Sequence, residues 1–353
     1  MKKRSFKFWM FSVRENFLSI VFILFTLCLI IFSRSNLPAA KSGLKLWANA
    51  VVPSLFPFFV ATELLSYTNI ISLLGSYLNC IMRPLFNVPG EGSFPFIMGI
   101  ISGYPTGAKI VSKFKEEGVC NSVEAERLLA FTNNSGPLFI VGTVGIALFG
   151  NIEIGILLLI THILSCITVG FIFRFWKCNT SSSSISLTSF TSSTNLAISF
   201  SSLGKIIGTS ITNATHTVVL IGGFVVIFSV IISIINSSGI LALLCNILTP
   251  IFNVLKINPE FSSGFISGLI ELTNGVNIVS TIPEKAISIN IIFCAFLLGF
   301  GGFSVILQVF SIVSEANISI KPYVIGKLLQ AIVASLYTYL LIQNFDFFNL
   351  NLL

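Results

Sequence analysis

The chain has 353 residues but few charges: 20 lysine or arginine residues and 13 aspartate or glutamate residues give a formal net charge of +7. Charged residues make up 9% of the sequence and hydrophobic residues 54%, whereas about 25% of a soluble domain is charged. This composition excludes an ordinary water-soluble domain and predicts an all-α, polytopic bundle of transmembrane helices in a lipid bilayer. The positive charge does not indicate nucleic acid, because the basic residues lie at the ends of apolar runs, as they do beside membrane spans.

The first apolar run covers residues 17–33 and follows a basic segment that includes Lys2, Lys3 and Arg4. The run is long for the core of a cleaved signal peptide, and many more apolar runs follow it, so we expect an uncleaved anchor. The basic flank predicts a cytoplasmic N-terminus in a bacterial cell membrane. We assign residues 1–47 to this anchor and its connector.

The next part, residues 48–176, contains helix candidates separated by breaks. One apolar stretch, residues 94–112, is interrupted by Gly99, Gly103, Pro105 and Gly107. Asn121 with Glu124 three residues later resembles a capping box, so we predict a helix that starts there and runs into a second break at 133–137. A full span needs about 20 residues, and 154–173 supplies them. The other candidates are residues 48–68, 70–82 and 138–149.

Residues 177–202 are dominated by serine and threonine and are predicted to form a flexible linker. The second half, residues 203–343, has a similar series of segments, and residues 344–353 form a tail. Within the second half, the apolar stretch 261–282 is interrupted by glycines, Glu271 and Asn274. The other helix candidates are residues 217–235, 239–254, 286–298 and 322–342. The third of these leads into Gly299, Gly301 and Gly302.

Short sequence matches recur between the two halves at offsets of 165 to 168 residues. The matched segments are 84–88 with 250–254, 99–103 with 264–268, 110–112 with 278–280, and 130–131 with 295–296. Because order and spacing both persist, we infer a duplication into two repeats with re-entrant or discontinuous helical hairpins. Many secondary transporters contain two repeats whose broken helices meet at a substrate site near the bilayer midplane. The alternative is ordinary kinks at helix crossings, since glycine and proline are common in membrane helices.

Ionisable residues within apolar segments carry functional predictions, because burying such a group in a membrane is costly. Lys109 follows the first break, where a cation and freed backbone N–H groups would favour an anionic ligand. Glu271 lies in the corresponding break of the second half and is a candidate coupling group for a proton or sodium ion. Glu63 is a second coupling candidate, but it can instead pair with Lys109, which would remove both from substrate chemistry. The simpler alternatives are a Lys109 that snorkels to the interface and a Glu271 at a helix end, and His162 is interpreted as a packed helix residue.

The two pairs of breaks are expected to form a polar cavity, with the break at 133–137 facing the one at 299–308. The candidate substrate ligands are the hydrogen-bonding side chains of these segments together with Lys109. They are Ser102, Tyr104, Thr106, Lys109, Asn133, Asn134, Ser135, Thr273, Asn274, Ser304 and Gln308.

Signatures of catalysis and of cofactor binding are missing from the sequence. It has no Walker loop, no H-E-x-x-H and no nucleophile elbow. Its seven cysteines are scattered without a C-x-x-C pair and are interpreted as small hydrophobic residues. We therefore predict no enzymatic activity, no cofactor and no metal site, and we leave an oligomeric assembly open.

Longer motifs make the sequence resemble the sporulation integral membrane protein YlbJ family, whose members carry the nucleoside-recognition Gate domain. The motifs are FNVPGEGS at 86–93, SGYPTGAK at 102–109, EAERLLAFTN at 124–133, SGPLFI at 135–140 and GFGGFS at 299–304. The resemblance covers about residues 45–340. It implies two Gate-like repeats, a role in spore maturation and cortex formation, and transport of dipicolinic acid across the outer forespore membrane toward the spore.

Three functions remain open at this point. The first is a carrier or conduit for a small anion, with dipicolinate favoured. The second is a carrier for nucleosides or another neutral polar metabolite, which would give no reason for a cation such as Lys109 at the break. The third is a non-transporting membrane scaffold used in sporulation. The coupling ion, the direction of transport and the relative orientation of the repeats are not fixed by the sequence.

Overall fold

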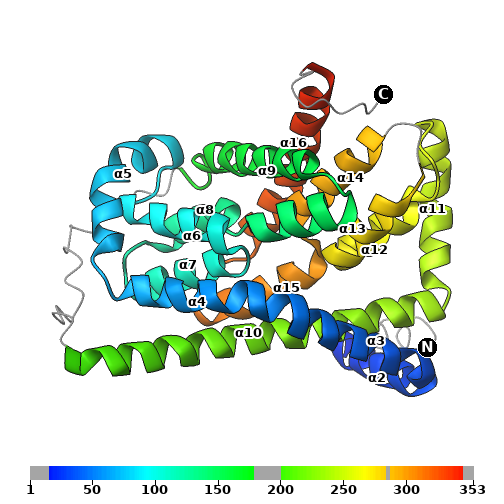
Figure 1. Ribbon diagram of the computed structural model, residues 1–353, viewed down its shortest axis with the longest axis horizontal. Coiled ribbons are helices and arrows are strands. Elements are labelled where there is room, and N and C mark those ends of the chain that lie inside the picture. Colours follow the sequence, from blue (N-terminus) through cyan, green and yellow to red (C-terminus); the bar gives the residue numbers. More distant parts are fainter. Residues whose placement is uncertain (1–15, 179–199, 284–286, 345–353) are drawn as a thin grey trace, which may run out of the picture.

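The computed structural model describes residues 16–178, 200–283 and 287–344, and the figures and statements that follow concern these parts. They contain helices and turns but no strand (Figure 1). Four helices are long and apolar enough to cross a membrane, and up to six if each of two sharply bent pairs counts as one span. The prediction of an all-α, polytopic membrane bundle is therefore confirmed. The four are Ile152–Phe173, Leu203–Ser237, Ser288–Glu315 and Lys321–Gln343.

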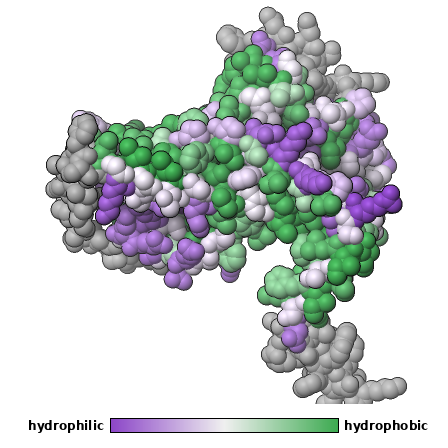
Figure 2. All heavy atoms as spheres, turned by 60° about the horizontal axis from the view of Figure 1, so that its bottom comes forward, coloured by the Kyte–Doolittle hydropathy of each residue, from purple (hydrophilic) through white to green (hydrophobic). Residues whose placement is uncertain are grey.

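Hydrophobic side chains cover much of the face seen in Figure 2, with hydrophilic side chains gathered in separate patches. Large apolar residues are widely exposed on the outside, for example Leu18, Tyr77 and Leu243. In water such a surface would drive aggregation. In a bilayer the acyl chains cover it, so the surface agrees with the composition.

The predicted N-terminal anchor over residues 17–33 is shorter than expected and sharply bent. Helix α2 (Phe17–Ile31) ends two residues early, and the pair that it forms with the next helix, α3 (Ser33–Leu46), is bent by 98°. The polar sequence Ser33-Arg34-Ser35-Asn36 explains the change, because it does not suit the hydrocarbon core. The Asn36 amide donates at 3.4 Å to Cys28 O and at 3.5 Å to Leu29 O, and so links the start of α3 to the last turn of α2.

Three helices form one face of the molecule, two of them end to end along the third (Figure 1), and we call them the outer layer. They are α3, α4 (Val52–Ser66) and the 38-residue α10 (Phe200–Ser237). A π-helical turn, η1 (Trp47–Val51), joins α3 to α4, and the Trp47 indole N–H donates to Val218 O on α10 at 2.9 Å. Phe59 packs with apolar residues of α10 in a separate small core.

The first half continues with a series of short helices behind this layer. Helix α5 forms a pair with α4 that is bent by 84°. The predicted capping box is present at the start of α8: the Asn121 side chain accepts from the Glu124 N–H at 2.9 Å, and the Glu124 carboxylate accepts from the Asn121 N–H at 3.0 Å. The elements are α5 (Ile70–Phe86), η2 (Gly90–Gly92), α6 (Ser93–Ser102), α7 (Thr106–Glu116), α8 (Ser122–Thr132), the π-helical η3 (Leu138–Leu148) and α9 (Ile152–Phe173).

The second half repeats this order of elements after α10. Its predicted breaks are observed at Glu271, between α12 and α13, and at Gly301, between α14 and α15. The boundaries of the two repeats stay predictions, and most of the proposed linker lies outside the described residues. The elements are α11 (Ile240–Val254), α12 (Phe261–Ile270), α13 (Leu272–Thr281), α14 (Ile287–Phe300), α15 (Gly302–Glu315) and α16 (Lys321–Asn344).

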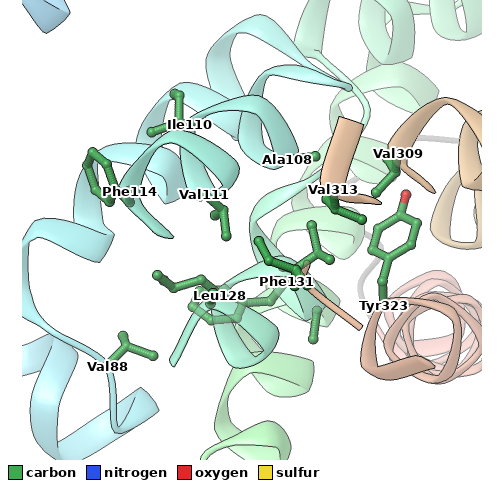
Figure 3. Close-up of a cluster of buried hydrophobic side chains, with 14 of the residues drawn as sticks. Val88, Ala108, Ile110, Val111, Phe114, Leu128, Phe131, Val309, Val313 and Tyr323 are labelled. Carbon is green, nitrogen blue, oxygen red and sulfur yellow. The ribbon is translucent and has the colours of Figure 1, made fainter. Parts of the chain in front are cut away.

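Helix α16 lies at the junction of the two halves. It packs against α14 of its own half and against α8 and α9 of the first half. Figure 3 shows Tyr323 of α16 beside Phe131 of α8 and Val313 of α15 in one cluster of buried side chains. The largest hydrophobic core is therefore shared by both halves.

Candidate functional site

Within each half, the two breaks lie directly against one another. A Cβ atom added at Gly103, between α6 and α7, would lie 2.9 Å from the backbone nitrogen of Gly136, between α8 and η3. In the second half, a Cβ atom added at Gly302 would lie 3.2 Å from Gly268 O and from Leu272 N. Gly302 has a φ of +83°, a value that residues with a side chain rarely adopt. Both contacts leave no room for a side chain.

Tyr104 brings the breaks of the two halves together. It follows Gly103 and lies near enough to Ser135, Tyr323 and Glu271 for electrostatic interaction with each. The segment around residues 102–109 and the segment around Glu271 are therefore close in space. A carrier built from two broken repeats requires this proximity.

A buried group of polar side chains surrounds this junction, and we call it the central polar cluster. The Asn133 amide donates to the Tyr323 hydroxyl at 2.9 Å, and the Gln330 amide donates to Asn134 Oδ1 at 3.0 Å. The Ser135 backbone N–H donates to Nε2 of His162 at 3.2 Å. The cluster consists of Asn133, Asn134, Ser135, His162, Tyr323, Lys327 and Gln330, all of them buried.

Lys327 belongs to the cluster, but it was not among the ligand residues that we predicted from the sequence. Its side chain is 2% exposed, and its Nζ donates to Gln330 Oε1 at 2.8 Å and lies 5.8 Å from the centre of the Tyr323 ring. Gln330 was not selected, and His162 was set aside as a packed residue. The pair of polar residues three positions apart on an apolar helix was the available signal, because residues at i and i+3 share a helix face.

Several buried polar atoms near the junction have no hydrogen-bond partner within the described chain. They include Asn133 Oδ1, His162 Nδ1 and Thr132 Oγ1. Most buried polar atoms in proteins are paired, and each one that is not needs an explanation. Unused donors and acceptors gathered at one place are suited to binding a polar ligand.

Glu271 caps the N-terminus of α13. Its carboxylate accepts from the backbone N–H groups of Thr273 at 3.0 Å and Asn274 at 2.9 Å. A negative charge is favoured at this end of a helix, where N–H groups are free and the helix dipole is positive. The side chains of Thr273 and Asn274 are half-buried. The coupling role that we predicted for Glu271 stays a prediction.

Lys109 and Glu63 form an ion pair, which was the alternative considered for them. Lys109 Nζ lies 2.6 Å from Glu63 Oε1 and 3.0 Å from Thr217 Oγ1, while the Asn213 amide donates to Glu63 Oε2 at 3.3 Å. The pair joins α7 to α4 and α10 of the outer layer. A second, weaker contact follows the same boundary, because the hydroxyls of Thr62 and Ser102 are 3.4 Å apart.

A cavity of about 940 Å³ lies beside this ion pair. Its lining includes Glu63, Ser66, Thr106, Lys109, Lys113 and Glu315. The opposite side of the first turn of α7 packs on the end of α8, where a Cβ atom added at Gly107 would lie 2.2 Å from Thr132 O and 3.1 Å from Asn133 Cα. The first turn of α7 therefore separates the cavity from the central polar cluster.

The remaining candidates lie on α15. Ser304 and Gln308 are buried, and Gln308 Oε1 is another polar atom without a partner in the part of the chain described here. The cavity beside α7 includes neither of them, nor Asn133. We expected the breaks at 133–137 and 299–308 to face each other across a cavity, and the cavity seen here lies elsewhere.

These features define an integral membrane protein in which paired broken helices enclose a polar junction. Residues 49–211 and 218–318 match the family described as Gate, nucleoside recognition. The sequence is 35% identical over 337 residues to the sporulation integral membrane protein YlbJ of Bacillus subtilis (strain 168), an alignment that covers 91% of this chain and 81% of that protein. The chain therefore belongs to the Gate family and, within it, to the group of YlbJ.

The fold is also similar to that of a solved protein, a variant of CNTnw whose structure is described as an intermediate 3 state. The TM-score is 0.53 with 12% sequence identity, and the similarity covers 87% of this chain and 84% of that one. At this identity the likeness concerns the fold. It extends over both halves of this chain.

Proposed function

We propose that this protein is a membrane carrier or conduit for a small polar metabolite, which binds where the broken helices of the two halves meet. One observation carries the proposal: buried polar atoms of the first half without a partner in the described chain gather at this junction, beside Tyr323, Lys327 and Gln330 of the second half. Leaving such groups unpaired costs about 1–3 kcal/mol each. A transported ligand that pairs with them in part of its cycle explains why the sequence retains them. The Gate-family fold supports the same reading.

The cargo that we propose is a small anion, with dipicolinate as the first candidate. The similarity to a sporulation membrane protein supports this choice. The location that we propose is the outer forespore membrane, with a cytoplasmic N-terminus. The proposed ligand groups are the selected side chains of the breaks. Glu271 and Glu63 are the proposed coupling groups, for a proton or sodium ion. No enzymatic activity is part of this proposal.

A neutral, nucleoside-like cargo is the second candidate. The family description names nucleoside recognition, and the ion pair with Glu63 neutralises Lys109, which weakens the argument that we drew from that lysine. A non-transporting scaffold is the third candidate. The two carriers differ from the scaffold in flux and from each other in the charge of the solute.

Flux into proteoliposomes tests the proposal. We expect saturable uptake of radiolabelled dipicolinate by liposomes that contain the purified protein, above that of empty liposomes, with labelled uridine as the neutral comparison. If uridine alone is taken up, the carrier proposal stands, but the proposed cargo is a neutral molecule and not dipicolinate. If neither solute enters faster than into empty liposomes under proton or sodium gradients of either direction, the carrier proposal is wrong and the scaffold is favoured.

A further inference from the structure

Lys327 is a buried lysine for which the described residues offer no carboxylate. Helix α16 packs on α14, α9 and α8. Neither α16 nor α14 contains an aspartate or glutamate, and the one acidic residue of α9, Glu153, is exposed in its first turn. On α8, Glu126 pairs with Lys177 and Trp176, and Glu124 belongs to the capping box. Glu271, the remaining acidic group near the junction, accepts from the start of α13.

The charge is costly in this position. An unpaired charge that is buried in protein is costly, and a neutral acceptor such as Gln330 Oε1 supplies one hydrogen bond but no counter-charge. The ammonium group has three donors, and the described contacts use one of them. Such a group is suited to receive an anion from outside the chain.

A second buried donor is found in the same cluster. The Ser135 N–H donates to His162 Nε2, so a neutral imidazole carries its hydrogen on Nδ1. His162 Nδ1 is buried and has no partner among the described residues. Lys327 and His162 thus supply buried donors from two different elements of the cluster, and such donors are the partners that a carboxylate accepts from.

We infer that Lys327 is the residue that selects an anionic cargo, by pairing with a carboxylate group of a small organic acid at the central polar cluster. The inference rests on the proposed carrier function and adds to it the residue that recognises the charge of the cargo. Lys109, which is already paired with Glu63, does not serve this purpose. The cavity beside α7 does not include Lys327.

The test compares a dianion with a neutral molecule of the same shape. Purified wild-type protein and the variants Lys327→Met, Lys327→Arg and Lys321→Met are compared for flux and binding of dipicolinate, its neutral diamide and uridine. Lys321 is the matched control, because it is an exposed lysine on the same helix. We expect wild type and Lys321→Met to prefer dipicolinate to the diamide, and Lys327→Met to lose at least about tenfold of this preference, a change equivalent to about 1.4 kcal/mol. Lys327→Arg should retain a larger part of it.

The results separate the inference from the proposed function. If Lys327→Met is folded, as judged by its melting temperature and elution volume, and still prefers the dianion as wild type does, the inference is wrong while the carrier remains. If wild type carries uridine and not dipicolinate, the inference is also wrong and the carrier again remains. If wild type carries none of the three solutes, the proposed function itself fails. A buried lysine that serves packing alone would change stability without changing the preference between dipicolinate and its diamide.

Discussion

Replacing Gly99 by alanine is expected to lower the melting temperature of the purified protein by roughly 5 °C or more and to abolish solute flux. Gly99 lies on α6 against the end of α8, and an added Cβ atom would lie 1.7 Å from Thr132 O. No rotamer change relieves this contact, because both partners are backbone. Overpacking of this kind costs about 1–3 kcal/mol even when side chains can move. Thermal unfolding in detergent and proteoliposome uptake measure the two effects.

Gly223→Ala is the matched control for this substitution. Gly223 lies on α10, and no atom of another element lies within 4 Å of its added Cβ. Since alanine favours a helix over glycine by about 1 kcal/mol, this variant should be at least as stable as wild type. A Gly99→Ala protein that melts and transports like Gly223→Ala would contradict the close packing of the broken helices on α8.

Breaking the ion pair between Glu63 and Lys109 is expected to have the second large effect. Glu63→Gln leaves the Lys109 ammonium in a partly buried position without its carboxylate; the two side chains are 13% and 34% exposed, respectively. An exposed pair contributes about 0.2–1 kcal/mol, whereas breaking a fully buried pair costs about 3–5 kcal/mol. We therefore expect a loss of roughly 1–3 kcal/mol, measured as a lower melting temperature.

The double variant Glu63→Gln with Lys109→Met supplies the control. If the two residues act as a pair, the double variant should be more stable than the sum of the two single losses predicts, because the stranded charge is gone. Strictly additive losses would show that the two residues do not stabilise one another. Since the pair joins α7 to the outer layer, we also expect both single variants to change the rate of flux.

Local signals allowed parts of this structure to be predicted from the sequence. The capping box at Asn121 could be recognised because its hydrogen bonds join residues three positions apart. The breaks at Gly103 and Gly301 could be recognised because glycine there repeats at similar places in both halves. The bend after Ile31 was missed, because hydropathy alone does not separate one straight span from a shorter helix followed by a polar one.

The local spacing of Lys327 and Gln330 marks a polar face of the helix, but it does not show that Lys327 is buried at the centre of the protein. It lies six residues after Lys321, near the start of a membrane helix, where lysine usually faces water or headgroups. Its burial depends on α8, α9 and α14, which lie far from it in the sequence. Lys109 shows the reverse case. The sequence placed it correctly beside a break, but its pairing with Glu63 is a contact between distant segments, and the sequence offered that pairing only as an alternative.

The most direct test of the account is the location of a bound solute. We suggest a density map of the protein in lipid nanodiscs, held by an antibody fragment and saturated with the solute that it transports. We expect solute density at the central polar cluster, in contact with Asn133 and with a group of the second half such as Tyr323 or Lys327. Solute density confined to the rim of the cavity beside α7, with the cluster unchanged, would contradict it.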